Sequence, residues 1–363
     1  MRIKPDFVWL AVAAPVAATV LIEWGHMYKP FRTVDEQVQI LESRNLIVGD
    51  GSSHYLRREG YYDIVNGYKD LFLDNKPQSP GQTDHFADTV TFEDIYTLFL
   101  FDRNLRFLMF EGLAQAEAVF KTACSYCFMG EYATEKNPYL NVQHYDQSKT
   151  MIAQDLIDKV FQKILDRNDG SQPKKEKDYI RHCMISHGGE VPLWVLANDL
   201  SFGQMKWFFQ VLDKHMQIKI SEEITNIYRH TRQGQHDIRQ HEYNIKTDRL
   251  QRVLNRLVFF RNICAHDERL FCAKYDNRVN ESVFVAINDL RFFLDRDDYI
   301  AFYRRFLLLL SGIKHKLPDQ WERLHRRMGI RREDELMIKR EKYEGGQTSS
   351  AIITNPECTK NKA

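Results

Sequence analysis

The sequence has almost no excess of charge of either sign. Its 363 residues contain 51 Lys and Arg against 50 Asp and Glu, which gives a net charge of +1 at pH 7. Proteins with a general affinity for polyanions usually carry a strong positive field over their whole surface. Such an affinity is therefore excluded, and any contact with nucleic acid must be made by a local basic cleft.

Cysteine is scarce and scattered, which excludes a disulfide framework and favours a reduced, cytoplasmic protein. Cys124 and Cys127 have metal-ligand spacing, but no second pair with matching spacing exists, so we interpret them as core thiols. His230, His236 and His241 stand mainly among Arg and Gln rather than acids, which favours a loop over a metal site. We expect neither a metal ion nor another cofactor.

Long apolar runs are also rare, and the one at residues 7–22 is ambiguous. It is shorter than the roughly 20 residues that span a membrane, and Pro15 interrupts it. A basic start before it would suit a signal peptide, although no small-residue cleavage site follows. Alternatively, Met27 is the natural start and residues 1–26 are an extension. We favour Met27 and expect no membrane partner, while a membrane anchor stays an open alternative.

The sequence lacks the recurrent alternation of apolar and polar residues that is typical of β-strands, and it predicts an all-α fold. With 43% hydrophobic and 12% aromatic residues, the chain can bury a substantial core. We expect one helical domain over 27–335, a loop at 74–90, a linker at 169–177 and a disordered tail at 336–363. The expected helices are 33–45, 53–60, 61–68, 92–129, 148–166, 192–199, 202–212, 221–228, 247–266, 281–293 and 297–314.

Side chains that cap helices mark several of these starts. Thr33 and Glu36 have the spacing of a capping box, in which each side chain binds the backbone N–H of the other residue. Thr91, Ser201 and Ser221 each precede a helical pattern and are expected to be N-caps. The tyrosines of 61–68 are expected in the core, with base stacking as the alternative.

Polar residues interrupt the apolar pattern of the helix predicted at 92–129. They include Asp102, Arg106, Glu117 and Lys121. Glu117 and Lys121 are four residues apart, in the order that favours an ion pair within a helix. These residues are either solvated helix pairs or a lattice of salt bridges that lines a cleft.

The most informative stretch is Arg261-Asn262-Ile263-Cys264-Ala265-His266, at the end of a long apolar-periodic helix. Asn262 and His266 share a helix face, whereas Arg261 lies about 140° round from His266. A permanent cation beside a group that exchanges protons near neutral pH suits phosphodiester chemistry. On this local pattern alone, a histidine that merely caps the helix is the commoner case.

These segments together resemble the AbiD/AbiF type of abortive infection proteins, which belong to the larger group of HEPN-fold ribonucleases and toxins. Family members commonly begin just after their initiator Met at a position that corresponds to Met27. The likeness spans roughly residues 27 to 330 in the right order, which no single short motif could supply. It is carried by Tyr28-Lys29-Pro30-Phe31-Arg32-Thr33, Gln37 to Leu46, Tyr55-Leu56, Gly60-Tyr61-Tyr62, Gly67-Tyr68, Leu98, Phe101 to Arg106, Glu117, Pro192-Leu193-Trp194, Ser201-Phe202-Gly203, Arg261 to His266 and Arg269-Leu270.

Two positions depart from the family pattern. Members often have a second histidine directly after the motif histidine, where this chain has Asp267. Four residues after Glu117, the usual arginine is replaced by Lys121, a point charge rather than a planar fork. The Arg261 and His266 core is retained, but Asp267 changes the charge beside the imidazole.

The resemblance implies a HEPN-like helical bundle with additional N-terminal and C-terminal helices, and RNA cleavage without a metal ion. His266 would be the general acid and base, Arg261 would hold the phosphate, and Asn262 would orient either group. Asp102, Arg106, Glu117, Lys121, Asp267 and Arg269 would support them.

The resemblance also implies partners. HEPN sites are commonly built from two motifs that face each other across a homodimer, and two Arg and two His would create the local positive cleft. The substrate would be host or phage RNA, and an antitoxin or a phage-encoded trigger would control the enzyme. The alternative is a non-catalytic HEPN-like regulator that binds RNA or protein through the same helices.

Overall fold

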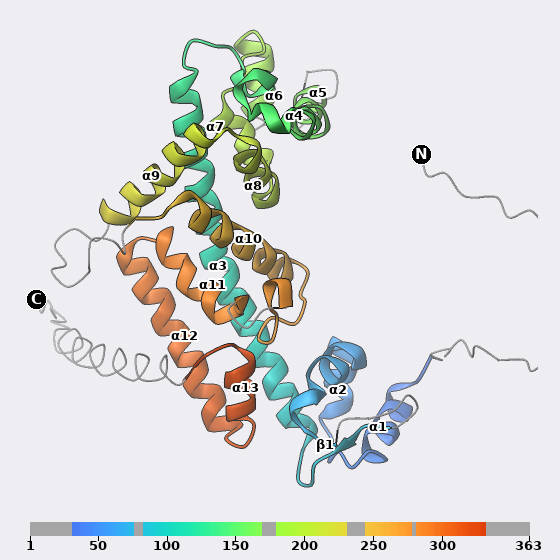
Figure 1. Ribbon diagram of the computed structural model, residues 1–363. Coiled ribbons are helices and arrows are strands. Elements are labelled where there is room, and N and C mark those ends of the chain that lie inside the picture. The colour runs from blue at the N-terminus through green and yellow to red at the C-terminus, as the bar shows by residue number, and fades with distance from the viewer. Residues whose placement is uncertain (1–30, 76–82, 169–178, 231–243, 278–280, 332–363) are drawn as a thin grey trace, which may run out of the picture.

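The computed structural model describes residues 31–75, 83–168, 179–230, 244–277 and 281–331, and these are mostly helical (Figure 1). The prediction of an all-α fold is confirmed. The axis of the molecule is helix α3 (Phe92–Glu131), whose 40 residues make a rod about 60 Å long. Most of the other elements are arranged along this rod.

Two short strands, β1 (Leu73–Asn75) and β2 (His85–Phe86), form an antiparallel pair near the start of α3. Short π or 3₁₀ turns extend or join several helices, among them Tyr62–Asn66, Ile157–Phe161, Ala197–Asp199 and Leu290–Phe292. The other α-helices are α1 (Val34–Glu42), α2 (Ser52–Glu59), α4 (Thr150–Leu156), α5 (Gln162–Arg167), α6 (Tyr179–Ser186), α7 (Leu193–Leu196), α8 (Phe202–Val211), α9 (Lys214–His230), α10 (Thr247–Ala265), α11 (Val283–Asp289), α12 (Arg296–Lys316) and α13 (Trp321–Arg327).

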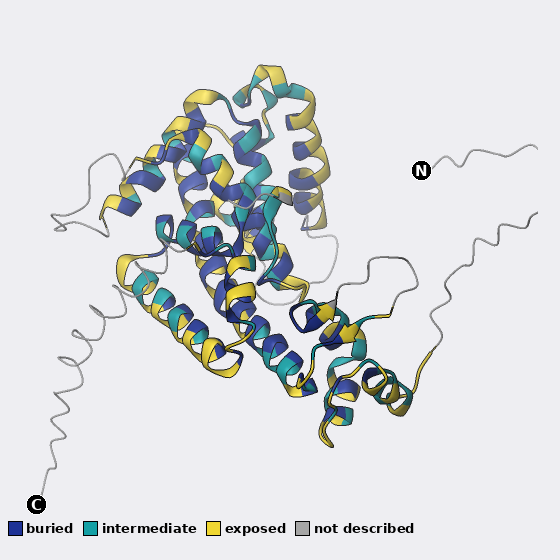
Figure 2. Cartoon of the chain, turned by 60° about the horizontal axis from the view of Figure 1, so that its bottom comes forward, coloured by how far each residue is buried: buried dark blue, intermediate teal, exposed yellow. Residues whose placement is uncertain are grey.

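Helices α12, α9 and α10 pack along α3, and α7 and α8 also contact it. Figure 1 places α1 and α2 beside the first turns of α3 and α4 to α6 beside its far end. The buried faces of the helices turn toward one another, as the dark blue ribbon of Figure 2 shows. One hydrophobic cluster reaches from Leu41 to Ile330, so apolar burial links the ends of the described chain.

The predicted capping residues explain where three of these helices begin. The Thr33 hydroxyl accepts the N–H of Glu36 at 3.2 Å, and the Glu36 carboxylate accepts the N–H of Thr33 at 2.8 Å. Thr91 and Ser201 cap α3 and α8 in the same reciprocal way. These bonds satisfy N–H groups that have no partner within a helix, so local sequence alone determines these starts.

The prediction that Ser221 begins a short helix is wrong. Helix α9 starts a full two turns earlier, where the Asp213 carboxylate accepts the N–H of Met216 at 2.7 Å. Ser221 lies inside the helix and its hydroxyl donates to the carbonyl of Gln217 at 2.7 Å. A serine can bond backward within a helix as well as cap its start, and its identity does not distinguish the two.

The described parts of segment 74–90 are not all loop, as was expected there. Strand β1 runs into the segment and pairs with β2 near its end, with Leu73 opposite Phe86, and Phe86 is buried. Strands this short have no alternation that a sequence pattern can reveal. In the neighbouring segment Tyr68 is buried as expected, whereas Tyr62 is exposed.

The core thiols lie where the sequence placed them. Cys124 and Cys127 are buried on α3, and burial raises the pKa of Cys127 to about 11. A thiol with a pKa this high stays protonated and unreactive at neutral pH. Within the described ranges, no group of three or more His, Cys, Asp and Glu is arranged to hold a metal ion.

Several predicted segments lie outside the described residues. They are the N-terminal extension 1–26 with its apolar run, the linker 169–177, His236 and His241, and the tail 336–363. Among the helices that the structure describes, none is both long and apolar enough to cross a membrane.

Glycine at one position of α3 allows the close approach of α12. A Cβ at Gly112 would lie 2.8 Å from Leu290 Cδ1 and 3.2 Å from Phe302 Cε2, whereas a Cβ at Gly312 in α12 meets nothing within 4 Å. We expect Gly112→Ala to lower the free energy of unfolding by about 1–2 kcal/mol through overpacking. Gly312→Ala should raise it by roughly 0.5–1 kcal/mol through helix propensity. Urea denaturation of both variants measures this; an equal stabilisation of both would contradict the packing.

Candidate active site

The segment 261–266 forms the last turn of α10 and its C-cap. Helix α10 ends at Ala265, and the backbone N–H of His266 donates to the carbonyl of Asn262 at 3.0 Å. Leu257, Phe260 and other apolar side chains are buried and fix the helix to the core, while Asn262 and His266 are exposed. An amide and an imidazole are therefore presented to solvent on one face of the helix end.

The Arg261 side chain points to a different neighbour. Its Nε lies 3.6 Å from Oε2 of Glu117 on α3, and the other carboxylate oxygen of Glu117 lies 2.8 Å from the ammonium of Lys121. An Nη atom of Arg261 also lies 3.5 Å from the amide oxygen of Asn262. The structure thus brings Arg261, Glu117 and Lys121 into one row of alternating charge, in which Glu117 offsets the repulsion between the two cations.

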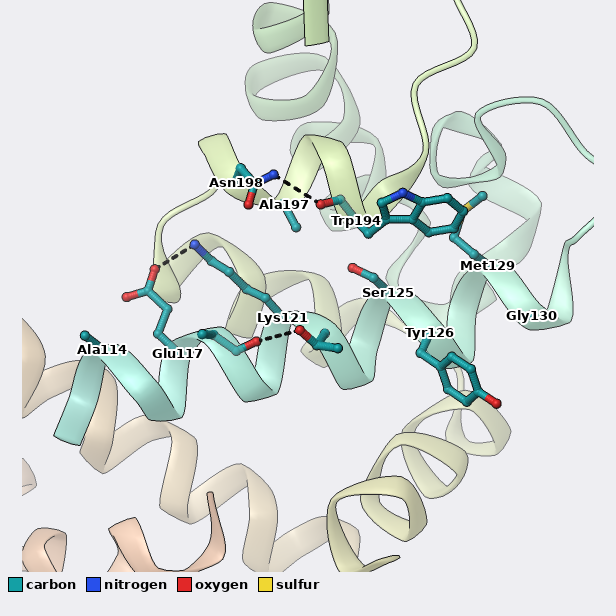
Figure 3. A pocket seen from close by; sticks show the side chains of 12 residues that line it. Ala114, Glu117, Lys121, Ser125, Tyr126, Met129, Gly130, Trp194, Ala197 and Asn198 are labelled. Atoms are coloured by element: carbon teal, nitrogen blue, oxygen red, sulfur yellow. Dashed lines mark hydrogen bonds and ion pairs between the residues drawn. The ribbon is translucent and has the colours of Figure 1, made fainter. Parts of the chain in front are cut away.

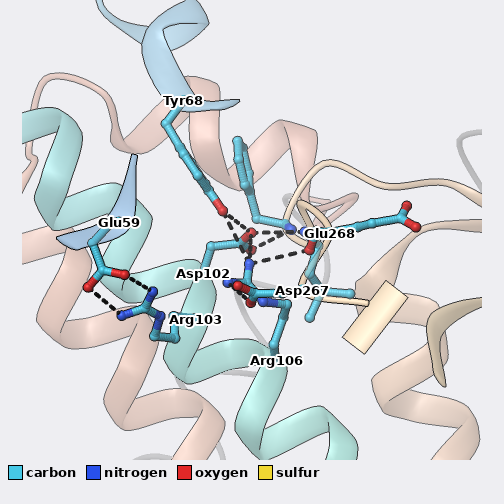
Figure 4. A network of polar contacts seen from close by, with 9 residues as sticks. Glu59, Tyr68, Asp102, Arg103, Arg106, Asp267 and Glu268 are labelled. Carbon is cyan, nitrogen blue, oxygen red and sulfur yellow. Dashed lines mark hydrogen bonds and ion pairs between the residues drawn. The ribbon is translucent and has the colours of Figure 1, made fainter. Parts of the chain in front are cut away.

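A buried ion pair on α3 contacts the segment that follows α10 (Figure 4). Asp102 and Arg106 lie one turn apart on α3 and form an ion pair at 3.0 Å, and Asp102 is fully buried. The Asp102 carboxylate also accepts the backbone N–H groups of Leu270 at 2.9 Å and Phe271 at 2.7 Å and the hydroxyl of Tyr68 at 2.8 Å. Through these bonds, the Asp102 carboxylate holds the segment that follows the motif against α3.

Asp267 completes this connection. It has a positive φ of 56°, and the N–H of Glu268 reaches back to the carbonyl of Ile263 at 3.1 Å. This is the left-handed C-terminal turn of a Schellman motif, at the position where glycine is usual and aspartate is tolerated. The Asp267 carboxylate lies 2.5 Å from Nη2 of Arg106, whose Nη1 donates to the carbonyl of Glu268 at 3.3 Å. Asp267 thus fixes the turn that follows His266.

The electrostatics of this network favour a fixed cation at Arg106. Burial acts to lower the pKa of Arg106, but the oxygens of Tyr68 and Asp102 outweigh it, so the pKa is raised. Burial raises the pKa of Asp102, and the Leu270 N–H and the Arg106 charge oppose that shift. Burial and the Asp102 charge also raise the pKa of Tyr68. Asp102 and Arg106 are almost inaccessible to solvent, and their contacts are with the segment that follows the motif.

Arg269 is directed away from the motif face. It donates to the carbonyl of Gly67 and lies 3.9 Å from the Asp70 carboxylate, which Arg327 of α13 also approaches at 3.6 Å. Its role in the described chain is to connect the segment after α10 with the N-terminal region. A supporting role for Arg269 beside the motif, which the family resemblance implies, stays a prediction.

Most of the predicted site residues form two groups, and His266 and Arg269 belong to neither. Arg261 joins Glu117 and Lys121, while Asp267 joins Asp102 and Arg106. Among the described residues, no hydrogen bond or ion pair connects the side chains of Arg261 and His266. Within the described residues of one chain, the side chains of Arg261 and His266 are therefore not bonded to each other.

Sequence reasoning missed two residues that hold this region together. Tyr68 is predicted only as a core aromatic, yet its hydroxyl is a direct partner of both Asp102 and Arg106. Glu59 at the end of α2 receives two hydrogen bonds from Arg103, at 3.0 and 2.6 Å (Figure 4). The sequence positions of Tyr68 and Glu59 do not indicate these contacts with α3, because only tertiary folding brings the residues together.

Comparison with known proteins identifies a family. Residues 54–272 match the family model described as Abi-like protein, which covers more than half of the chain. The matched range begins in α2, contains all of α3 and α10, and ends just after Phe271, the last residue bound by Asp102. No curated protein and no solved structure matches the chain.

The buried network makes a sharp stability prediction. Asp102→Ala should lower the free energy of unfolding by about 3–5 kcal/mol, because it leaves the Arg106 charge and two backbone N–H groups without their main acceptor. The matched control is Glu111→Ala, which removes the exposed partner of Arg305 from the same helix. This control should cost less than about 1 kcal/mol. Urea denaturation of the two variants tests the difference, and equal losses would contradict the assigned role of Asp102.

Proposed function

The chain belongs to the Abi-like protein family, and from this premise we propose that it is an abortive infection protein of phage defence that cleaves RNA without a metal ion. The observation that carries the proposal is the end of α10. There the exposed Asn262 and His266 stand beside a half-buried Arg261, on a turn that buried charges hold in place. An accessible imidazole and a guanidinium on one rigid element are the groups that transesterification of RNA requires.

The chemistry assigned to these residues is an internal phosphoryl transfer. The ribose 2′-hydroxyl loses its proton to a base and its oxygen forms a bond to the adjacent phosphorus. The bond from phosphorus to the 5′-oxygen breaks, and that oxygen takes up a proton. The products are a 2′,3′-cyclic phosphate and a 5′-hydroxyl. His266 supplies the proton transfers, Arg261 neutralises the charge on the phosphate, and Asn262 orients one of them.

The Arg261 environment supports a role in phosphate binding. Glu117 lies 3.6 Å from Nε of Arg261, and 29% of the arginine side chain is exposed. A guanidinium has five N–H donors, so pairing with one carboxylate leaves donors for a phosphate. Glu117 thereby orients Arg261, while Lys121 adds a second positive charge one turn along α3.

A complete site requires a second copy of the chain in this proposal. In one chain, Arg261 and His266 lie about 140° apart around α10, and no hydrogen bond joins them in the described ranges. Two motifs facing each other across a twofold axis would place the arginine of one copy near the histidine of the other. Such a homodimer would also concentrate positive charge locally in a chain whose net charge is only +1.

Control of the enzyme is part of the proposal. An RNase that stops growth must be silent before infection, so we expect an antitoxin or a phage-encoded trigger as a partner, acting in the cytoplasm. The second candidate function is a non-catalytic regulator that binds RNA or protein. Among the described residues of one chain, no hydrogen bond or ion pair joins the side chains of Arg261 and His266, and this favours the second candidate.

Incubation of the purified full chain with single-stranded RNA in EDTA separates the two candidates. We expect cleavage to continue in EDTA and to leave cyclic phosphate and 5′-hydroxyl ends. His266→Ala should slow it by about 10²–10⁴-fold through loss of proton transfer. Arg261→Ala should slow it by roughly 10²–10³-fold through loss of phosphate stabilisation.

The matched control is His315→Ala, which removes an exposed imidazole from the last turn of α12. This control should cleave like the wild type, and all three variants should keep the wild-type circular dichroism spectrum. Full activity of a folded His266→Ala protein, or cleavage that requires a divalent ion, would sink the catalytic assignment.

A further inference from the structure

A cavity of about 770 Å³ lies on the far side of the Glu117–Lys121 pair, between α3 and the segment of α7 with its following turn (Figure 3). One wall is a face of α3 that carries Glu117, Lys121 and Ser125, and the other carries Trp194 and Asn198. Its volume is within the range of pockets that hold nucleoside-sized molecules. None of the roles assigned above uses this cavity.

The α3 wall of the cavity contains a buried hydroxyl group that has no hydrogen-bond partner in the described chain. Ser125 is only 1% exposed, and its hydroxyl has no hydrogen-bond partner among the described residues. Figure 3 shows this hydroxyl directed from α3 toward the α7 side of the cavity. Buried hydroxyls are nearly always hydrogen-bonded, so an unpaired one that borders a cavity offers a donor and an acceptor to a ligand.

The opposite wall offers a flat aromatic surface. The Trp194 side chain is 56% exposed, although tryptophan is mostly buried in folded proteins. The Asn198 amide nitrogen donates to the carbonyl of Trp194 at 3.4 Å, and this bond leaves the amide oxygen available as an acceptor. An exposed indole next to hydrogen-bonding groups is the usual means of stacking and reading an unpaired base.

The cavity is directly connected to the proposed phosphate site. Glu117 borders the cavity, and its Oε2 lies 3.6 Å from Nε of Arg261. Lys121, with 17% of its side chain exposed, pairs with Glu117 and adds positive charge to the cavity wall. Glu117 and Ser125 are eight residues apart on α3, or about 12 Å along its axis, so a strand whose phosphate is held at Arg261 would reach Trp194 with a base further along the strand.

We propose that this cavity binds one nucleobase, stacked on Trp194 and hydrogen-bonded along its polar edge to the Ser125 hydroxyl. In its role as a substrate subsite, this inference rests on the proposed RNA-cleaving function. The same chemistry recognises a base within an RNA strand and the base of a free mononucleotide, so both sources are tested.

The experiment measures binding to the full chain with a probe that cannot be cleaved. It uses a short single-stranded oligoribonucleotide that is 2′-O-methylated at every position, and an abasic oligonucleotide of the same length and charge. Base stacking on an aromatic side chain should make the base-bearing strand bind about tenfold more tightly than the abasic strand. Trp194→Ala should abolish this preference, and Trp194→Phe should keep most of it.

Ser125→Ala tests the polar edge independently of folding. Loss of one hydrogen bond should weaken the base-bearing strand about fivefold, while removal of an unpaired buried hydroxyl should not lower the urea midpoint. The matched control is Ser52→Ala at the start of α2, which also removes a buried hydroxyl without a partner in the described chain. This control should leave both affinities unchanged.

A third arm titrates the four nucleoside 5′-monophosphates and follows tryptophan fluorescence. Quenching in the wild type that disappears in Trp194→Ala supports the pocket. If the oligonucleotides show no base preference in addition, the pocket binds the base of a free nucleotide rather than a base within a strand. Equal affinity for base-bearing and abasic strands together with no quenching would overturn the proposal, as would an undiminished base preference in Trp194→Ala. Because no arm requires cleavage, failure of the pocket is distinct from failure of the RNase assignment.

Discussion

The arrangement of the motif depends on one ion pair that is buried inside the molecule. Asp102 and Arg106 stand one turn apart on α3, and both are almost inaccessible to solvent. A buried ion pair contributes little net stability by itself. Each buried charge is nevertheless strongly destabilising when one of its partners is removed. Those partners are the backbone N–H groups of Leu270 and Phe271 and the carboxylate of Asp267. The pair thereby specifies where the chain must turn after α10.

Residues further along α3 contact other parts of the candidate site. The spacing from Arg106 to Glu117 is eleven residues, or about three helical turns, so both residues face the same side of the helix. On this side of α3, Arg106 binds Asp267 in the turn after His266, and Glu117 pairs with Arg261. Glu117 also lines the cavity that Ser125 borders. A rigid helix that carries all three features keeps their separations constant, which is the geometric requirement for a preorganised site.

The sequence predicted what local interactions determine. Thr33, Thr91 and Ser201 bind N–H groups within their own first turns, and the helices start where these residues stand. Ser221 was misplaced because a serine side chain can also bond backward to a carbonyl inside a helix. The Abi family was recognised from motifs in their order along the chain, and the family model confirms it.

The site was predictable only in its residue types. The stripe that contains Asp102 was visible as polar residues in an apolar helix, but its N–H partners follow 168 and 169 residues later. Neither spacing nor composition reveals such a contact, and the cavity beside Trp194 exists only once α7 packs on α3. Asp267 has a left-handed backbone and contacts Arg106, and neither property can be read from its position in the sequence.

The central claim, that RNA itself supplies the nucleophile, is tested most directly by removing one 2′-hydroxyl. Once a cleaved phosphodiester is mapped, a substrate with a single 2′-deoxyribose immediately 5′ of that phosphate is compared with the all-ribose strand. Internal transesterification predicts that cleavage stops at the substituted position while other sites in the same strand are still cut. Undiminished cleavage at the substituted position would contradict the account.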